Sequence, residues 1–209
     1  MNTLSEEYYR RYEELQSLLE RAYVDIYALQ EIEKYNAFVQ NDGYALPKSS
    51  FNVLRHISEL LKVDLGLTVW KISIDNNQKA NTIQHLSNYI RSSCANLVDV
   101  NHLPKTSFPK GLKNTANQLN TIRKNHLAHN DSEKQSVVIK ISEIADMAEH
   151  LKTVLNGLCF SNIDKRAMMI TDQDLRIIRN NVSLGLGMMI YRNTFPIKFK
   201  GENSDNSLD

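Results

Sequence analysis

Apolar residues recur at spacings of three and four along most of this chain, which is the pattern of one face of an α-helix. The first stripe contains Tyr8, Tyr12, Leu15, Leu19 and Ile26. The six tyrosines between positions 8 and 35 are expected to pack in the core rather than to stack on bases. The same periodicity predicts helices over residues 5–40, 51–73, 79–96, 109–130, 142–160 and 172–192. The predicted fold class is therefore all-α, an antiparallel helical bundle of about six helices.

Polar and helix-breaking residues mark the expected ends of these helices. Residues 41–43, Asn-Asp-Gly, interrupt the first helix. Ser49 or Ser50 is the predicted N-cap of the second helix, and Ser142 is the predicted N-cap of the fifth. Pro109 is tolerated in the first turn of the fourth helix, because a first-turn residue needs no intrahelical N–H donor.

Composition and charge exclude several classes of protein. The chain has 209 residues, of which 42% are hydrophobic and 23% are charged, with a net charge of +1. These values are typical of one globular domain and argue against a wholly basic coat protein or an acidic disordered chain. The two cysteines form no disulfide or zinc-ribbon pattern. Without a signal peptide or an apolar stretch of about 18 residues, the chain is expected to be soluble and cytoplasmic, with no membrane partner.

The charged residues are unevenly distributed along the chain. Residues 1–34 contain eight acidic and four basic side chains, whereas residues 100–130 contain no acidic residue. The bases of this acid-free window are Lys105, Lys110, Lys113, Arg123 and Lys124. This window is of interest because its charges accompany an unusual residue placement. A solvated helix face has a similar composition, so the charge pattern alone does not identify a ligand.

The placement of Arg123 is the most informative feature of this window. On an ideal helix Leu112, Ala116, Leu119 and Arg123 fall within roughly 60° of one another. The arginine therefore lies in an apolar stripe, where a permanently charged guanidinium is costly unless it is paired or faces a polar cavity or interface. Two alternatives remain open, namely a functional arginine and a structural one bound to a carboxylate or to helix C-terminal carbonyls.

Three polar residues follow Arg123 near the predicted end of the helix. His129 is six positions later, and Asn125 is its neighbour at a spacing of four. His129 is a candidate for proton transfer, or a cation at the negative end of the helix dipole. His126, His129 and Asp131 form only a weak metal-ligand pattern, so no metal and no other cofactor are predicted.

An arginine, polar residues behind it and a histidine six positions on, near the end of an amphipathic helix, resemble the signature of HEPN domains. The string Ala128-His129-Asn130-Asp131 also resembles the ending of the abortive-infection, AbiU-type branch, and Asp75 is similar to an upstream aspartate of that branch. One difference is that many HEPN domains have Asn, Asp or His directly after the arginine, where this chain has Lys124.

The resemblance implies a homodimer that cuts RNA without a metal and serves as a toxin or phage-defence protein, with a possible antitoxin partner. Arg123 would bind the phosphate and His129 would transfer protons, with Asn125 or His126 assisting either role. Lys110, Lys113 and Lys124 would bind the RNA backbone. The alternative is a helical module that binds RNA or a protein without catalysis.

The predicted domain organisation has three parts. Residues 1–48 are expected to form a long helix and loop that pack on the core or extend from it. Residues 49–200 are expected to form the HEPN-like helical bundle, and 201–209 a disordered tail.

Overall fold

The structure is a computed structural model that describes residues 4–41, 44–45, 48–75, 80–127, 139–161, 163, 166–193 and 197–198. Within these ranges, only the backbone is described for residues 38–51, 125–127 and 191–198. The expected tail, residues 201–209, lies outside the described part of the chain.

The prediction of an all-α fold is confirmed for this part of the chain. It contains six α-helices: α1 (Glu6–Asn41), α2 (Lys48–Ser73), α3 (Ile83–Ser93), α4 (Lys113–Leu127), α5 (Ile141–Gly157) and α6 (Asp172–Asn193). Two short 3₁₀ helices, η1 (Val100–His102) and η2 (Lys110–Leu112), lie between α3 and α4. Among the described residues, no helix combines the length and the apolar character needed to cross a membrane.

Two short strands were not predicted from the sequence. β1 (Tyr44–Ala45) pairs antiparallel with β2 (Ile197–Lys198), so that Tyr44 lies opposite Lys198 and Ala45 opposite Ile197. Strands of two residues leave no alternating pattern long enough to be read from a sequence. This ladder joins a segment that follows α1 to a segment that follows α6.

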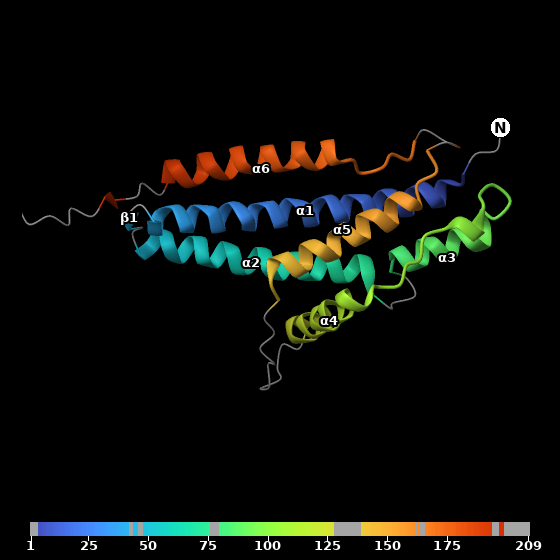
Figure 1. Cartoon of the computed structure of the whole chain (residues 1–209), viewed down its shortest axis with the longest axis horizontal. Helices are drawn as coiled ribbons and strands as arrows, with labels where there is room; N and C mark the ends of the chain where they lie inside the picture. The colour runs from blue at the N-terminus through green and yellow to red at the C-terminus, as the bar shows by residue number, and fades with distance from the viewer. Residues whose placement is uncertain are drawn as a thin grey trace, which may run out of the picture.

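α1 is the central helix of the bundle. It has 36 residues, which corresponds to about 54 Å of helix, and it packs against α2, α3, α5 and α6. Figure 1 shows α6 on one side of α1, with α2 on the other side and α4 beyond α2. α4 and α6 therefore lie at opposite edges of the molecule.

The core follows the apolar face of α1. All six tyrosines between positions 8 and 35 are buried, as the sequence predicts. The Tyr8 hydroxyl donates a hydrogen bond to the carbonyl of Leu158, at 2.9 Å, and the Tyr23 hydroxyl donates one to Glu149, at 2.8 Å. These bonds join α1 to α5 and to the residue that ends it, because a buried hydroxyl needs a hydrogen-bond partner.

One helix departs from a purely antiparallel bundle. α2 and α5 run antiparallel to α1, whereas α6 runs parallel to it (Figure 1). The first turn of α6 lies near Gln16 and Glu20 of α1, and Ile190 near its end packs with Tyr35. α6 begins at the end of the bundle where α5 finishes and runs in the opposite direction to α5, which makes it parallel to α1 (Figure 1).

Several predicted helix ends are wrong by a few residues. α2 begins at Lys48 rather than after Ser49 or Ser50, and α3 begins only at Ile83. The N-cap of α5 is Lys140 and not Ser142. The Lys140 N–H donates to the Glu143 carboxylate at 3.3 Å, so the acidic side chain of the first turn closes this end of the helix.

Candidate functional site

The candidate site is built on α4, which packs against α2 and α5. Ala116 and Leu119 of the predicted apolar stripe are buried, and Leu119 has an exposed fraction of 0%. A methyl group at Gly66 of α2 would lie 3.6 Å from Leu119 Cδ2, so the two helices approach closely here. This contact fixes the position of the next turn of α4, which carries Arg123.

Arg123 is half-buried and stacks on Trp70 of α2. Its guanidinium carbon lies 4.7 Å from the centroid of the indole ring. Stacking of this kind is worth about 0.5–2 kcal/mol, and it uses the face of the guanidinium rather than its N–H groups. The arginine side chain is thus held in place by a contact that does not use its N–H groups.

Two N–H donors of this pair are buried without a partner among the described residues. They are Nε of Arg123 and Nε1 of Trp70. A buried donor without an acceptor costs about 1–3 kcal/mol, so the stacking energy does not clearly offset the cost of placing Arg123 here. Unpaired buried donors are rare in ordinary packing, so the position of Arg123 calls for an explanation beyond the stability of the bundle.

Three other arginines stack on tyrosines: two of them also pair with a carboxylate, and the third, Arg179 on Tyr27, is exposed whereas Arg123 is half-buried. Arg11 stacks on Tyr89 and also pairs with Glu7, and Arg166 stacks on Tyr9 and also pairs with Glu6. Within the described ranges Arg123 has no such carboxylate partner. The interpretation of Arg123 as an ion-paired structural residue therefore finds no support in this part of the chain.

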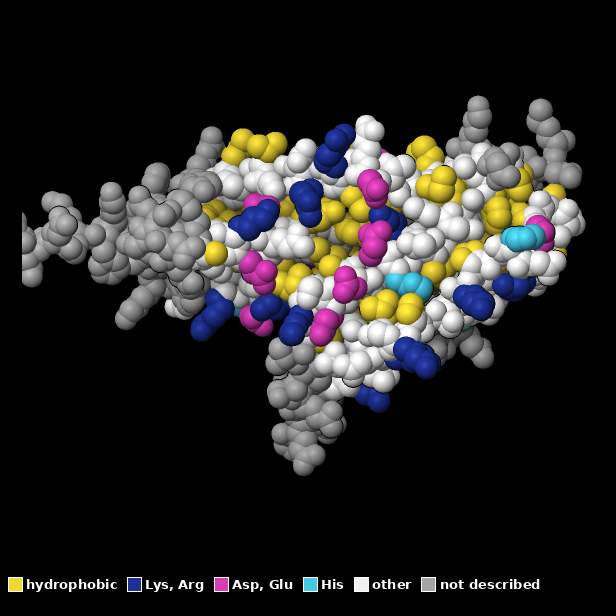
Figure 2. Space-filling view, in the orientation of Figure 1, with side chains coloured by type: hydrophobic (Ala, Val, Ile, Leu, Met, Phe, Trp, Pro, Cys, Tyr) yellow, Lys and Arg dark blue, Asp and Glu magenta, His cyan; other side chains and the backbone are white. Residues whose placement is uncertain are grey.

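The three lysines proposed from the sequence are exposed. Lys110 lies in η2, and Lys113 and Lys124 lie near the two ends of α4. Lys113 and Lys124 are eleven residues apart and therefore share a face of the helix, roughly 16 Å apart along its axis. In Figure 2 lysine and arginine side chains lie over the part of the surface formed by α4 and the loop before it.

The residues predicted to act with Arg123 lie at the end of α4 or beyond the described part of it. Asn125 and His126 belong to the last turn of α4, and their side chains are not described, while His129 lies outside the described residues. The expected approach of His129 to Arg123 stays a prediction. The metal alternative also stays open for His126, His129 and Asp131, although no group of three or more possible ligands occurs among the described residues.

Sequence analysis missed the aromatic partner of the arginine. Trp70 is the single tryptophan of the chain and lies 53 residues before Arg123. Helical periodicity locates each residue on its own helix, but it does not say which residue of α2 will face α4.

A hollow of about 340 Å³ lies between α2, α4 and α5. Its wall includes Ile122, the residue before Arg123.

Comparisons of the chain with protein-family models, with curated proteins and with solved structures found no match.

Proposed function

We propose that this protein is a metal-independent endoribonuclease that acts as a homodimer and cuts RNA with Arg123 and His129. The observation that carries the proposal is the position of Arg123, which stacks on Trp70 and has a buried Nε without a partner among the described residues. The acid-free window around α4 supports it, because bases without nearby acids attract a polyanion.

In the proposed reaction RNA supplies its own nucleophile, the 2′-hydroxyl. The neutral imidazole of His129 removes the proton from this hydroxyl, and the 2′ oxygen forms a bond to phosphorus. The bond between phosphorus and the 5′ oxygen then breaks, and the imidazolium of His129 gives its proton to the leaving oxygen, which restores the neutral imidazole. The products are a 2′,3′-cyclic phosphate and a 5′-hydroxyl end, so atoms and charge balance without a metal or an oxidant.

Arg123 has a different role in this proposal. Its guanidinium keeps its charge at every working pH, and its planar fork suits two non-bridging oxygens of the phosphate. Trp70 acts as a positioning residue, because stacking limits the rotation of the guanidinium. Asn125 or His126 would orient His129 or bind the phosphate.

The homodimer is part of the proposal because the mechanism needs a closed cleft. A two-fold axis next to α4 would bring two copies of Arg123 and His129 together. Lys110, Lys113 and Lys124 would hold the RNA backbone outside the cleft, so substrate affinity should fall steeply with salt. In a toxin or phage-defence role, a separate antitoxin protein would cover this surface until cleavage is needed.

The test is RNA cleavage by the purified protein in the presence of a chelator. Arg123→Ala should lower the cleavage rate about 10²- to 10³-fold, because it removes the charge that stabilises the phosphorus centre. His129→Ala should lower it about 10²- to 10⁴-fold, because it removes the proton acceptor. If both variants cut at the rate of the unmodified protein, the site assignment is wrong.

Arg179 provides a matched control. Its guanidinium carbon also lies 4.7 Å from an aromatic centroid, that of Tyr27, at the contact of α6 with α1. Arg179→Ala removes the same kind of stack far from α4 and should leave cleavage unchanged. Chelator-sensitive cutting would favour the metal alternative, and RNA binding without any cutting would favour the non-catalytic binding module.

The biological role has its own test, which is growth of a host that expresses the protein. Expression of the unmodified chain should arrest growth, and expression of His129→Ala should not. Equal toxicity of the two would separate any harmful effect from RNA cleavage.

A further inference from the structure

α6 is apolar on two opposite sides. One side packs on α1 through residues that are buried or half-buried: Leu175, Ile178, Val182, Leu186 and Ile190. The other side carries Ile177, Leu184 and Met188, with exposed fractions of 49%, 62% and 59%. These three residues lie within roughly 40° of one another on the helix and point away from the core side. We call them the outer stripe.

The outer stripe is open along its length. α6 packs mainly against α1, and among the described residues nothing lies within 4 Å of the positions that a Cβ would take at Gly185 and Gly187. The two glycines lie between Leu184 and Met188 in the sequence and have no side chains, so a second backbone can approach this part of the helix closely. An apolar stripe on an exposed helix usually marks an interaction surface.

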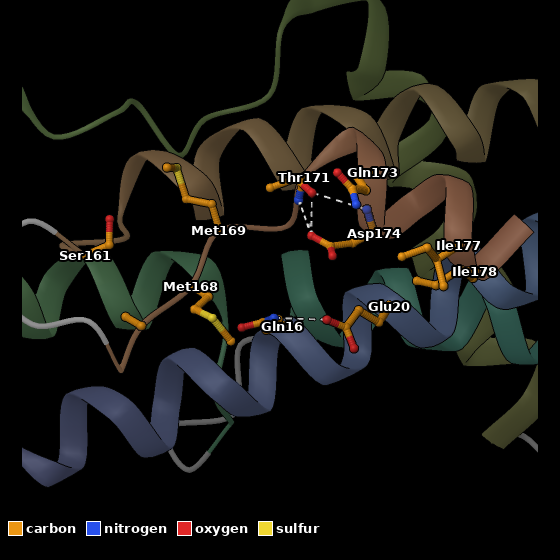
Figure 3. Close-up of a pocket in the computed structure, with 11 residues that line it drawn as sticks. Gln16, Glu20, Ser161, Met168, Met169, Thr171, Gln173, Asp174, Ile177 and Ile178 are labelled. Atoms are coloured by element: carbon orange, nitrogen blue, oxygen red, sulfur yellow. Dashed lines mark hydrogen bonds between the residues drawn. The ribbon is translucent and has the colours of Figure 1, made fainter.

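A hollow of about 770 Å³ continues the outer stripe at the start of α6. Ile177 belongs to both, and Met168 and Met169 form the apolar part of the wall (Figure 3). Gln16 and Glu20 of α1 close the opposite side (Figure 3). Methionine side chains are flexible and adapt to the shape of what enters such a hollow.

We infer that the outer stripe and this hollow form an interface with a second copy of the chain, in which α6 packs antiparallel to the partner's α6. Ile177 and Leu184 are seven residues apart, and so are Asn181 and Met188. This spacing is that of a two-helix seam, in which Asn181 is the one polar position. In the antiparallel register Ile177 faces the partner's Leu184 and Asn180 faces the partner's Asn181.

Charge and shape favour the antiparallel orientation over the parallel one. The first turn of α6 contains Asp174, which lines the hollow and which a parallel helix would bring next to its own copy. Antiparallel packing separates the two copies of this acid. It also brings the exposed Met188 of each copy to the hollow at the start of the partner's α6. The same helix thus carries an apolar projection at one end and a recess at the other.

The exposed apolar area is large enough for such an interface. It is contributed by the outer stripe together with Met168 and Met169, which line the adjoining hollow. These five side chains expose roughly 500 Å² per copy, so their complete burial in a symmetric pair would remove about 1,000 Å² from solvent, at the lower limit of specific interfaces. The interface does not depend on the proposed nuclease, because α4 lies at the opposite edge of the molecule (Figure 1).

The experiment is a mass measurement of the full chain by light scattering after gel filtration. Leu184→Glu places a charge in the middle of the outer stripe and should halve the mass of the unmodified assembly. That means a change from two copies to one, or from four to two if α4 also pairs. The matched control is Leu60→Glu on α2, because Leu60 is exposed to a similar degree, 57%. This control should leave the mass unchanged.

Three results would overturn the inference. They are a monomeric unmodified protein, a Leu184→Glu variant with the mass of the unmodified protein, and equal loss of mass in Leu60→Glu. Circular dichroism checks that the variants stay folded. RNA cleavage by Leu184→Glu should persist, so failure of the nuclease proposal and failure of the α6 interface give different results.

Cross-linking tests the orientation of the two helices. The double variant Ile177→Cys with Leu184→Cys should form a disulfide-linked pair under oxidation, because the two positions face each other in the antiparallel register. Leu184→Cys alone should not form one, since two copies of position 184 lie about 10 Å apart along the axis. Efficient cross-linking of this single variant would show a parallel pair and would reject the antiparallel arrangement.

Discussion

Replacing Asp25 with asparagine should stabilise the protein at pH 8 and should have little effect near pH 4. Asp25 lies on α1, has an exposed fraction of 5%, and has one carboxyl oxygen that is buried without a partner among the described residues. Burial raises the pKa of this carboxyl to about 7, with a further contribution from the Asp64 carboxylate, which shares a hydrogen bond with it. Asp64 is itself held by Arg21, with N–O distances of 2.7 and 3.0 Å.

The magnitude follows from the difference between the folded and unfolded pKa values. The ordinary pKa of an aspartate is 3.8 and the folded value is about 7, which corresponds to roughly 4 kcal/mol at pH values above both. Relaxation around the buried pair reduces this figure, so we expect about 2–4 kcal/mol. Between pH 4 and pH 7 the folded state keeps a proton that the unfolded state releases. The contribution of Asp25 to stability therefore falls as the pH rises through this window and is constant above it.

Urea denaturation at pH 4, 6 and 8 measures this effect. The free energy of unfolding of Asp25→Asn should exceed that of the unmodified protein by an amount that grows with pH and levels off above pH 7. Asp146→Asn on α5 is the control, because Asp146 is exposed and no hydrogen bond to it is seen among the described residues. A difference between Asp25→Asn and the unmodified protein that is constant with pH, or that has the opposite sign at pH 8, would refute the argument.

Three further substitutions test the packing of the bundle, each by the midpoint of urea denaturation. Tyr8→Phe should cost about 1–2 kcal/mol, because the carbonyl of Leu158 loses the hydroxyl that donates to it at 2.9 Å. Gly66→Ala should stabilise the chain by about 0.5–1 kcal/mol, since the added methyl group would meet Leu119 at an ordinary contact distance of 3.6 Å. Lys152→Ala should cost about 1–2 kcal/mol, because this nearly buried lysine pairs with two carboxylates that are themselves exposed.

The helices could be predicted because their burial is periodic. Tyr8, Tyr12, Leu15 and Leu19 of the first stripe are all fully buried. The ends were harder to predict, since several residues near each end have side chains that can accept from the backbone. The N-cap of α3 is Thr82, whose hydroxyl accepts from the backbone N–H of His85, although the periodic stripe alone suggested an earlier start.

The apolar surroundings of Arg123 could be predicted from the sequence, but its aromatic partner could not. The stripe of Ala116 and Leu119 places this arginine near apolar groups, because that relation lies within one helix. Its contact with Trp70 depends on how α2 crosses α4, which is set by side-chain packing along the whole helix pair and not by any local motif. The sequence therefore indicated an unusual arginine, but it did not indicate how the guanidinium is held.

For α6 the helix was predicted correctly, but its exposed apolar side was not predicted. A helix that is apolar on two sides is expected to be buried on both, yet α6 packs mainly against α1 and leaves Leu184 and Met188 exposed. α6 runs parallel to α1 along one edge of the bundle, so no later helix is placed to cover its outer side within the described chain. α4, at the other edge, has an exposed face that is basic rather than apolar. The two edges therefore suit different ligands, a second copy of the chain at α6 and a polyanion at α4, and each can be altered without changing the other.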